Sequence, residues 1–547
     1  MSSSPSPEQQ PEHSPEQDPQ PSGEPPQDQV DAVARDSRDG TAVWRDVVPE
    51  IEAGDLLPDS AGTVVVGAGL TGVTTALELR RRGHEVLLLE ATTVGAGTTG
   101  RTTGKASLLQ GTRYGDIRRF SGDDAVRSYA EAGAAARDWI QAELAEVPDA
   151  LRPQPAFTYA TSQPGIRSLQ AEADAMRVAG VTFETRFGEV GLPFLVSRAL
   201  VMTEQGQLQP LVALAVLAAK ARAAGVRIVD RCRVTAADAG AHGVTLNTTR
   251  GAVRAQRVII ATGFPAIDRG GFFATLTPTR EIVAAYTIEG PVPQGMYLSA
   301  DPVTRSLRPA VDEHGRELLV VGGPSFFPGR VPDTRRILRA QDRWTAQAFP
   351  SAKRVRWWAA QDYRLTNRMP YVGAMPMSHD RIFVATGFAK WGMTTAVAAA
   401  LALCGQLEGD APAWAQSLAR RHKSLRGAAQ LARTVGEVAA HTARGWAGPG
   451  ETHTERGVRA GIRRDGAKPI AHSEIDGVTC EVSAVCTHMG GVVRWNTLER
   501  TWDCPLHGSR FAPDGRVIEG PAQRDLPSAA GRQERPREPV GGDSVSS

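Results

Sequence analysis

The sequence contains little cysteine, with five residues among 547. So small and odd a number argues against a disulfide framework and favours a reducing compartment. Long apolar runs are also missing. The nearest, Ala396–Leu403, is far shorter than the ~20 residues that cross a bilayer. The N-terminal MSSSPSPEQQ lacks the basic region and the apolar core of a secretory signal. We therefore expect a soluble, cytoplasmic protein with no membrane span.

Charge of either sign is not in excess. The 62 basic and 60 acidic residues leave a formal net charge of +2, which gives no reason to expect nucleic acid or an anionic membrane as a partner. Residues 1–40 are rich in Pro, Gln, Ser, Glu and Asp, and residues 528–547 are of a similar kind. Such segments bury too little surface to offset the entropy of ordering, so we predict two disordered tails.

Residues 41–444 have a mixed α/β pattern and are predicted to form one large domain. The Gly/Pro cluster that starts at Gly445 ends the last helix, so residues 445–460 are predicted to be a linker. The short, turn-rich segment 461–527 is predicted to be a small all-β domain. Residues 277–320 alternate like an antiparallel sheet. Apolar runs predict strands at 63–66, 86–90, 226–229, 258–261, 318–321 and 382–385, and helices at 71–82, 125–145 and 210–224.

A glycine-rich turn follows the first strand directly, in the pattern GxGxxG. Its first glycine permits the tight turn, its second lets the backbone approach a pyrophosphate, and its third allows close packing of helix on strand. The start of the next helix faces the phosphates, and an acid at the end of the second strand can bond a ribose hydroxyl. The residues predicted to bind a dinucleotide here are Gly67, Gly69, Leu70, Thr71, Gly72 and Glu90.

Three further segments favour FAD over NAD. A second Gly/Thr-rich loop at 95–105 supplies the extra backbone that a long isoalloxazine arm needs. A short turn follows the strand at 258–261. A late strand, turn and helix at 382–394 can place a helix N-terminus at the flavin pyrimidine oxygens. The predicted FAD residues of these segments are Thr98, Thr99, Gly100, Thr103, Gly104, Lys105, Ala261, Thr262, Gly263, Gly387, Trp391, Gly392, Met393 and Thr394.

Two Cys/His pairs lie near the C-terminus. Cys486 and His488 form CxH, and Cys504 and His507 form CxxH, with fifteen residues between the pairs. Such pairs on two loops can hold a [2Fe–2S] cluster, with thiolates on one iron and imidazoles on the other. The alternative is a Cys₂His₂ zinc site, which more often uses CxxC or HxxxH spacing. The spacing therefore favours the iron–sulfur cluster.

The motifs VVVGAGLTGVTTALELRRRGHEVLLLE and ATGFAKWGMT resemble those of the D-amino-acid oxidase/glycine oxidase class, as does the segment 362–373. That resemblance implies a Rossmann-like α/β FAD-binding domain with an interleaved antiparallel-sheet substrate domain in residues 41–444. It also implies oxidation of an amine-type C–N bond by hydride transfer to flavin N5.

The C-terminal segments 485–490, 502–511 and 515–522 resemble Rieske [2Fe–2S] domains. Both halves in this order resemble bacterial FAD-dependent oxidoreductases with a C-terminal Rieske domain. This resemblance implies FAD and a Rieske cluster as the two cofactors.

The fusion suggests a function in which the flavin takes a hydride from a small amine or amino acid and passes electrons singly to the cluster. The external electron acceptor or donor stays open. One alternative is an NAD(P)H-driven flavin reductase, for which residues 318–324 are the only candidate second nucleotide site. Another is a non-enzymatic redox sensor or docking module.

Four residues are predicted to take part in catalysis. Lys105 and Lys390 lie in the flavin loops, where a lysine can stabilise reduced flavin or position a water. Arg280 and Tyr363 are predicted to bind a substrate carboxylate, because enzymes of the class that the sequence resembles use Arg and Tyr from the substrate sheet. Tyr286 and Tyr297 are further candidates for that role.

Overall fold

The computed structural model describes residues 40–46, 48, 50–448, 450–455 and 457–529. The tails predicted at 1–40 and 528–547 lie outside these residues, apart from Gly40, Ser528 and Ala529. In the part of the chain that the structure describes, strands form an eight-stranded sheet, a nine-stranded sheet and two four-stranded sheets.

The eight-stranded sheet, here called the parallel sheet, carries the glycine-rich turn. Its strands follow the order β16-β17-β10-β1-β2-β7, with β17, β10, β1, β2 and β7 parallel to their neighbours. The hairpin of β8 and β9 extends from β10, and β16 is an antiparallel edge strand. The bounds are β1 Ser60–Val66, β2 Val86–Leu89, β7 Arg227–Val229, β8 Val234–Gly240, β9 Gly243–Thr248, β10 Gly251–Ile260, β16 Tyr371–Ala374 and β17 Ile382–Thr386.

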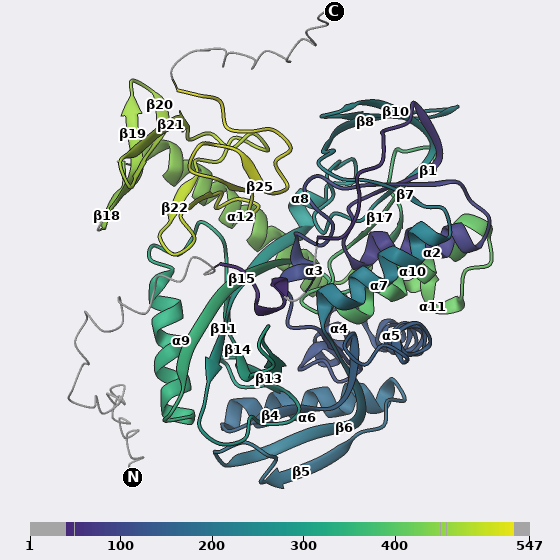
Figure 1. Ribbon diagram of the computed structural model, residues 1–547, viewed down its shortest axis with the longest axis vertical. Helices are drawn as coiled ribbons and strands as arrows, with labels where there is room; N and C mark the ends of the chain where they lie inside the picture. The colour runs from purple at the N-terminus through teal and green to yellow at the C-terminus, as the bar shows by residue number, and fades with distance from the viewer. Residues whose placement is uncertain (1–39, 47, 49, 449, 456, 530–547) are drawn as a thin grey trace, which may run out of the picture. The chain divides into compact units, whose positions relative to one another are not determined.

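Helices α2, α7 and α10 pack together against one face of the parallel sheet (Figure 1). Val65 and Leu88 of the strands and Leu77 and Val397 of the helices belong to one buried apolar cluster. The helices therefore cover the apolar strand residues on this face of the parallel sheet. Further helices lie around this layer. The bounds are η1 Val43–Arg45, α2 Leu70–Arg81, α3 Thr98–Arg101, α4 Arg113–Ser121, α5 Asp123–Leu144, α7 Pro210–Ala223, α8 Phe272–Thr275, α10 Gly392–Glu408 and α11 Ala413–Leu418.

The nine-stranded sheet, here called the substrate sheet, has the order β15-β11-β14-β13-β12-β4-β6-β3, with β5 paired to β6. Its pairs are antiparallel as predicted, except that β12 lies parallel to β4. Helix α9 runs along this sheet (Figure 1). The bounds are β3 Lys105–Ala106, β4 Leu151–Ala160, β5 Glu184–Gly188, α6 Gln163–Val178, β6 Val196–Leu208, β11 Leu276–Thr287, β12 Met296–Ser299, β13 Ser306–Val311, β14 Glu317–Phe326, α9 Arg335–Ala348 and β15 Lys353–Leu365.

The C-terminal sheets are two small antiparallel sheets with their own apolar cluster around Trp502 and Phe511. They follow α12, which ends three residues beyond the predicted domain boundary at 444. The predicted linker limits of 445–460 stay a prediction. The bounds are α12 Leu425–Ala447, β18 Thr452–Glu455, β19 Val458–Asp465, β20 Lys468–Ile475, β21 Val478–Ser483, β22 Arg494–Asn496, β23 Thr501–Asp503, β24 Arg510–Phe511 and β25 Val517–Glu519.

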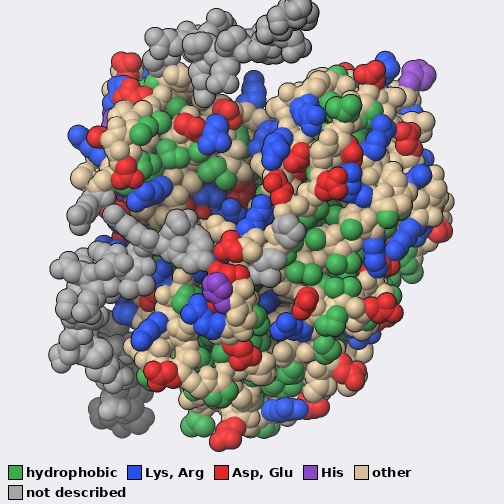
Figure 2. Space-filling view, viewed as in Figure 1, with side chains coloured by type: hydrophobic (Ala, Val, Ile, Leu, Met, Phe, Trp, Pro, Cys, Tyr) green, Lys and Arg blue, Asp and Glu red, His purple; other side chains and the backbone are tan. Residues whose placement is uncertain are grey.

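Basic and acidic side chains are interspersed on the face shown in Figure 2, in keeping with the balanced composition. Among the described residues, none of the helices combines the length and the apolar character that a bilayer crossing needs.

We expect Gly72→Ala to remove FAD and to destabilise the fold. A Cβ at Gly72 would lie 1.8 Å from the carbonyl oxygen of Gly67, so α2 would have to move away from β1. Overpacking of this kind costs about 1–3 kcal/mol, which thermal unfolding and the flavin content of the purified protein would show. The matched control is Gly436→Ala on α12, where a Cβ meets nothing within 4 Å. An unchanged melting temperature and full flavin content in Gly72→Ala would contradict the role of this glycine.

Candidate functional site

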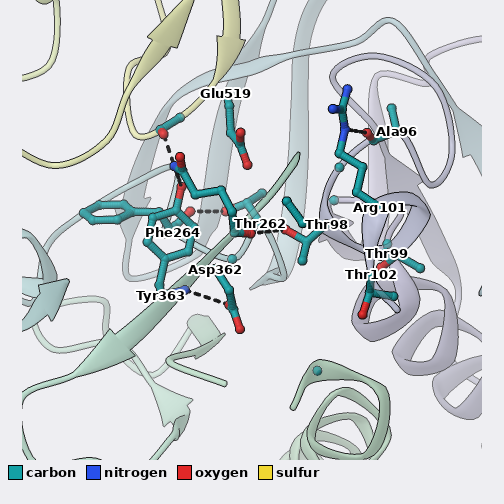
Figure 3. A pocket seen from close by; sticks show the side chains of 18 of the residues that line it. Ala96, Thr98, Thr99, Arg101, Thr102, Thr262, Phe264, Asp362, Tyr363 and Glu519 are labelled. Atoms are coloured by element: carbon teal, nitrogen blue, oxygen red, sulfur yellow. Dashed lines mark hydrogen bonds between the residues drawn. The ribbon is translucent and has the colours of Figure 1, made fainter. Parts of the chain in front are cut away.

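A cavity of about 570 Å³ opens at the carboxyl ends of β1, β2, β10 and β17 (Figure 3). This is the edge at which parallel α/β sheets bind ligands. Several predicted cofactor residues line it, and all four predicted segments contribute. They are Gly67, Gly69, Leu70, Thr71, Glu90, Thr98, Thr99, Thr103, Lys105, Ala261, Thr262, Gly263, Trp391, Gly392 and Met393.

The glycine-rich turn lines the cavity with backbone, because its glycines carry no side chain. Gly67 has a φ of +103°, and a Cβ there would lie 2.7 Å from the carbonyl oxygen of Ala261. Glu90 accepts a hydrogen bond from the backbone N–H of Ala68 at 2.9 Å, which fixes its carboxylate beside the turn. Thr99 accepts from the N–H of Leu70 at 3.0 Å, so the second loop is tied to the start of α2. The turn can therefore receive a pyrophosphate with little rearrangement.

Five predicted cofactor residues do not line the cavity. Gly72, Gly100 and Gly104 are packing positions, since a Cβ at each would lie within 2.5 Å of a backbone carbonyl oxygen. The hydroxyl of Thr394 accepts a hydrogen bond from Gln110 at 3.0 Å behind the cavity wall. Gly387 packs against Leu365. These residues shape the cavity and do not border it.

Lys105 and Lys390 lie at one end of the cavity, together with Glu281. The Lys105 ammonium donates to the carbonyl oxygen of Tyr297 at 3.2 Å and to the hydroxyl of Ser306. Burial lowers the pKa of Lys105 from 10.5 to about 7. The Lys390 ammonium pairs with the Glu281 carboxylate. Two cations and one carboxylate therefore face the same space.

The predicted carboxylate-binding residues are not together. Tyr363 lines the cavity, and its hydroxyl donates to the carbonyl oxygen of Gly520 at 3.2 Å. Tyr286 and Tyr297 point into the core, where they donate to Asp342 at 2.8 Å and to the Val190 carbonyl oxygen at 3.0 Å. We do not retain these two as substrate ligands.

Arg280 does not line the cavity either. Its side chain is fully buried, and its Nε donates to a Glu499 oxygen at 2.6 Å. A second ion pair joins it to Glu519 at 3.1 Å. Both carboxylates belong to the C-terminal sheets, so Arg280 connects the substrate sheet to them and is not available for a substrate carboxylate.

The four predicted cluster ligands lie on two neighbouring loops. In the first loop Gly490 donates its N–H to the carbonyl oxygen of Cys486 at 3.0 Å, and in the second Gly508 donates to Cys504 at 3.1 Å. The rings of His488 and His507 lie with their centroids 5.1 Å apart at an angle of 88°. A hydrogen bond with the Cys504 thiol holds the pKa of Cys486 at about 7, against the effect of burial.

This arrangement fits a [2Fe–2S] cluster. His507 Nδ1 is buried without a hydrogen-bond partner, as expected of a nitrogen that binds metal. Among the described residues, no three Cys, His, Asp or Glu side chains converge on the space of a single ion. A tetrahedral zinc site needs three or four such ligands, whereas each iron of a Rieske cluster takes two. The donor set therefore favours the cluster over zinc.

Residues of the C-terminal sheets also border the cavity, which no sequence pattern predicted. Arg510, Glu519, Gln523 and the segment Arg516–Gly520 line it together with the predicted dinucleotide residues. Figure 3 shows Glu519 above Phe264 and Tyr363 on this cavity. These residues lie more than a hundred positions from the nucleotide motifs, and no short-range pattern links them.

Aromatic rings separate the cavity from the predicted cluster ligands. Phe264 and Tyr363 line the cavity and pack edge to face with centroids 5.5 Å apart. The ring centroids of Phe264 and His488 lie 5.8 Å apart, and those of Phe273 and His507 lie 6.1 Å apart. The histidine side of the cluster site therefore faces the parallel sheet.

Comparison with known proteins gives two family matches, to the FAD dependent oxidoreductase model over residues 63–406 and to the Rieske [2Fe-2S] domain model over residues 452–530. A Bacillus subtilis protein named as a Rieske 2Fe-2S iron-sulfur protein, YhfW, is 31% identical over 484 residues, which are 84% of this chain and 92% of that protein.

Solved structures agree on the fold of the larger part. L-amino acid deaminase from Proteus vulgaris superposes with a TM-score of 0.54 at 17% identity, covering 68% of this chain and 99% of its own. Glycine oxidase from Geobacillus kaustophilus gives 0.53 at 20% identity, covering 67% and 100%. At these identities the likeness concerns the fold alone.

We expect Cys504→Ser to abolish the Rieske signal in low-temperature EPR of the reduced protein while FAD stays bound, because the change removes one thiolate ligand and leaves the FAD loops untouched. Cys480→Ser on β21 is the matched control, since Cys480 is not one of the predicted ligands. A Rieske signal that persists in Cys504→Ser, or disappears in Cys480→Ser, would contradict the ligand set.

Proposed function

Because the chain belongs to the FAD-dependent oxidoreductase family and carries a C-terminal Rieske [2Fe–2S] domain, we propose that it oxidises a small amine or amino acid and passes the electrons to its own iron–sulfur cluster. The protein is an enzyme that binds FAD and a [2Fe–2S] cluster. When bound, the flavin accepts a hydride from the substrate C–H and the cluster accepts single electrons.

The observation that carries the proposal is the shared wall between the two sites. Phe264 lines the cavity, and its ring also packs edge to face against the predicted cluster ligand His488. Tyr363 lies beside it and bonds to Gly520 of the Rieske domain. Phe264 and Tyr363 would thus contact both the cavity and the Rieske domain if the cofactors were bound in these two sites, which supports direct transfer within one chain.

We propose that FAD occupies the cavity and that the lining residues of the four predicted segments bind it. The cavity end with Lys105, Lys390 and Glu281 then holds the substrate. An amino acid carries one carboxylate and one ammonium group, so Lys390 and Glu281 can each exchange their mutual ion pair for a substrate group of opposite charge. Names of the structural neighbours, an amino acid deaminase and a glycine oxidase, support the same substrate class.

The reaction needs a proton transfer beside the substrate. A substrate bound as an ammonium ion must first give up a proton, and the neutral amine can then lose a hydride from carbon to the flavin. Lys105, with its pKa near 7, is placed to hold or release a proton beside the bound substrate. Tyr363 is a positioning residue, because burial raises its pKa far above the ordinary value and keeps the phenol protonated.

No observation favours the NAD(P)H-driven alternative. Residues 318–324 lie inside β14, an antiparallel strand of the substrate sheet, and not in a turn at the carboxyl end of a parallel strand. The segment therefore does not form a second nucleotide turn.

The function is tested by mixing the protein anaerobically with a panel of small amines and amino acids. Stopped-flow absorption should show the flavin band bleaching, and freeze-quenched samples should show the Rieske EPR signal rising afterwards. Bleaching by NADH or NADPH, with none by any amine, would refute the proposal.

We expect Lys105→Met to slow flavin reduction by about 10²-fold, since a positioned acid or base contributes at least that much. The pKa of Lys105 is lowered, so the ammonium form is present below pH about 7 and is lost above it. Substrate affinity should therefore weaken as pH rises through about 7 in the wild type, and this step should be absent in Lys105→Met.

The control for this test is Lys220→Met on α7, whose ammonium pairs with Glu143 away from the cavity.

The lowered pKa of Lys105 also makes the stability of the fold depend on pH. Because the unfolded chain holds the Lys105 proton up to pH 10.5 and the folded chain only to about 7, stability contributed by this group rises between those pH values. If substrate affinity depends on pH in the same way in the wild type and in Lys105→Met, Lys105 is not the titrating group.

A further inference from the structure

The Rieske domain supplies part of the wall of the FAD cavity. Its segment Arg516–Gly520, together with Gln523, borders the same space as the glycine-rich turn and Glu90. The segment is attached to the FAD-binding part at both ends. Arg233 donates to the Val517 carbonyl oxygen at 3.5 Å, and Tyr363 donates to that of Gly520 at 3.2 Å.

A buried ion-pair cluster fixes this contact. Arg280 of β11 and Arg510 of β24 share the carboxylate of Glu499, with Arg510 at 2.9 Å. Both arginines also reach Glu519, at 3.1 and 3.4 Å, and Arg510 pairs with Asp503 at 3.1 Å. The side chains of Arg280, Arg510 and Asp503 are almost fully buried, so each charge depends on its partners.

The two parts also approach closely at two glycines, where the absence of a side chain on the glycine is required. A Cβ at Gly508 would lie 2.8 Å from Pro278, and one at Gly329 would lie 2.6 Å from the carbonyl oxygen of Asp503. Gln361 donates to the Gly508 carbonyl oxygen at 2.9 Å. Contacts this close allow only one position of the Rieske domain against the FAD-binding part.

We propose that FAD is bound by both domains, with the Rieske segment Arg516–Gly520 and Gln523 retaining the dinucleotide in the cavity. Opening the contact between the domains then releases FAD faster. The proposal rests on the placement of FAD in this cavity, and it is independent of whether electrons pass to the cluster or which substrate is oxidised.

The first test variant is Glu499→Gln in the full chain, which removes the carboxylate shared by Arg280 and Arg510. The release of FAD is followed by the rise in flavin fluorescence after dilution, and we expect it to be at least 10-fold faster than in the wild type. Glu481→Gln is the matched control, because Glu481 pairs with Arg463 on the outer sheet of the same domain. The Rieske EPR signal should be retained in both variants.

The second variant is Ile518→Asp, which leaves the ion-pair cluster intact. Ile518 is 40% exposed and lines the cavity, so the substitution is compatible with folding and adds a negative charge to the wall of a cavity that would hold an anionic dinucleotide. Faster release is expected again. Val478→Asp is its control, a 67% exposed position on β21. If Glu499→Gln loses the Rieske signal, its Rieske domain is no longer intact, and the proposal is tested by Ile518→Asp alone.

Faster release in the test variants and not in the controls supports the proposal. Release at the wild-type rate in Ile518→Asp and in a folded Glu499→Gln would overturn it, as would equal acceleration in the controls. Gly69→Leu distinguishes failure of this proposal from a wrong placement of FAD. Full FAD content in Gly69→Leu would show that FAD binds outside this cavity, whatever the FAD release rates of the other variants. None of these readouts depends on amine oxidation.

Discussion

Two arginines and three carboxylates, of which Glu519 is partly exposed, lie together where the substrate sheet meets the Rieske domain. Removing charges from water costs several kcal/mol for each ion, and only mutual pairing offsets this. Burial alone raises the pKa of Glu499, yet Arg280 and Arg510 hold it at about 2, so the carboxylate stays ionised at any physiological pH. The relative position of the two cofactor sites depends on this cluster, because loss of one member would leave a buried charge unpaired.

The cavity combines two electrostatic environments. Its nucleotide end offers backbone N–H groups and bare glycines at the start of α2, where a pyrophosphate is favoured by the helix dipole. Its other end holds Lys105, Lys390 and Glu281, partly removed from water. The low dielectric there strengthens charge recognition and shifts the Lys105 pKa toward neutrality. One continuous space therefore combines the backbone of the glycine-rich turn with charged side chains.

The sequence predicted the parts of this molecule that depend on local spacing. GxGxxG, the loop at 95–105 and the CxH and CxxH pairs each fit within a single turn or loop. Most of the predicted FAD residues line one cavity, and their binding roles stay predictions. Pairings across long separations were not predictable. Arg280 was assigned to a substrate, but it meets Glu499, 219 residues away. Tyr286 and Tyr297 were chosen by residue type, which does not show whether an inward-pointing strand residue faces core or cavity.

The two histidine ligands predicted for the cluster differ in exposure, because His507 is buried and His488 is only partly buried. His507 is 2% exposed and packs near Phe273, so a diffusing protein cannot touch it while the domains stay docked. The loop with Cys486 differs, because Met489 is 47% exposed and Trp446, which donates to the Gly490 carbonyl oxygen, is 43% exposed. The exposed side chains of Met489 and Trp446 therefore mark a face of the cluster site that an external molecule can reach, whereas His507 is shielded from it.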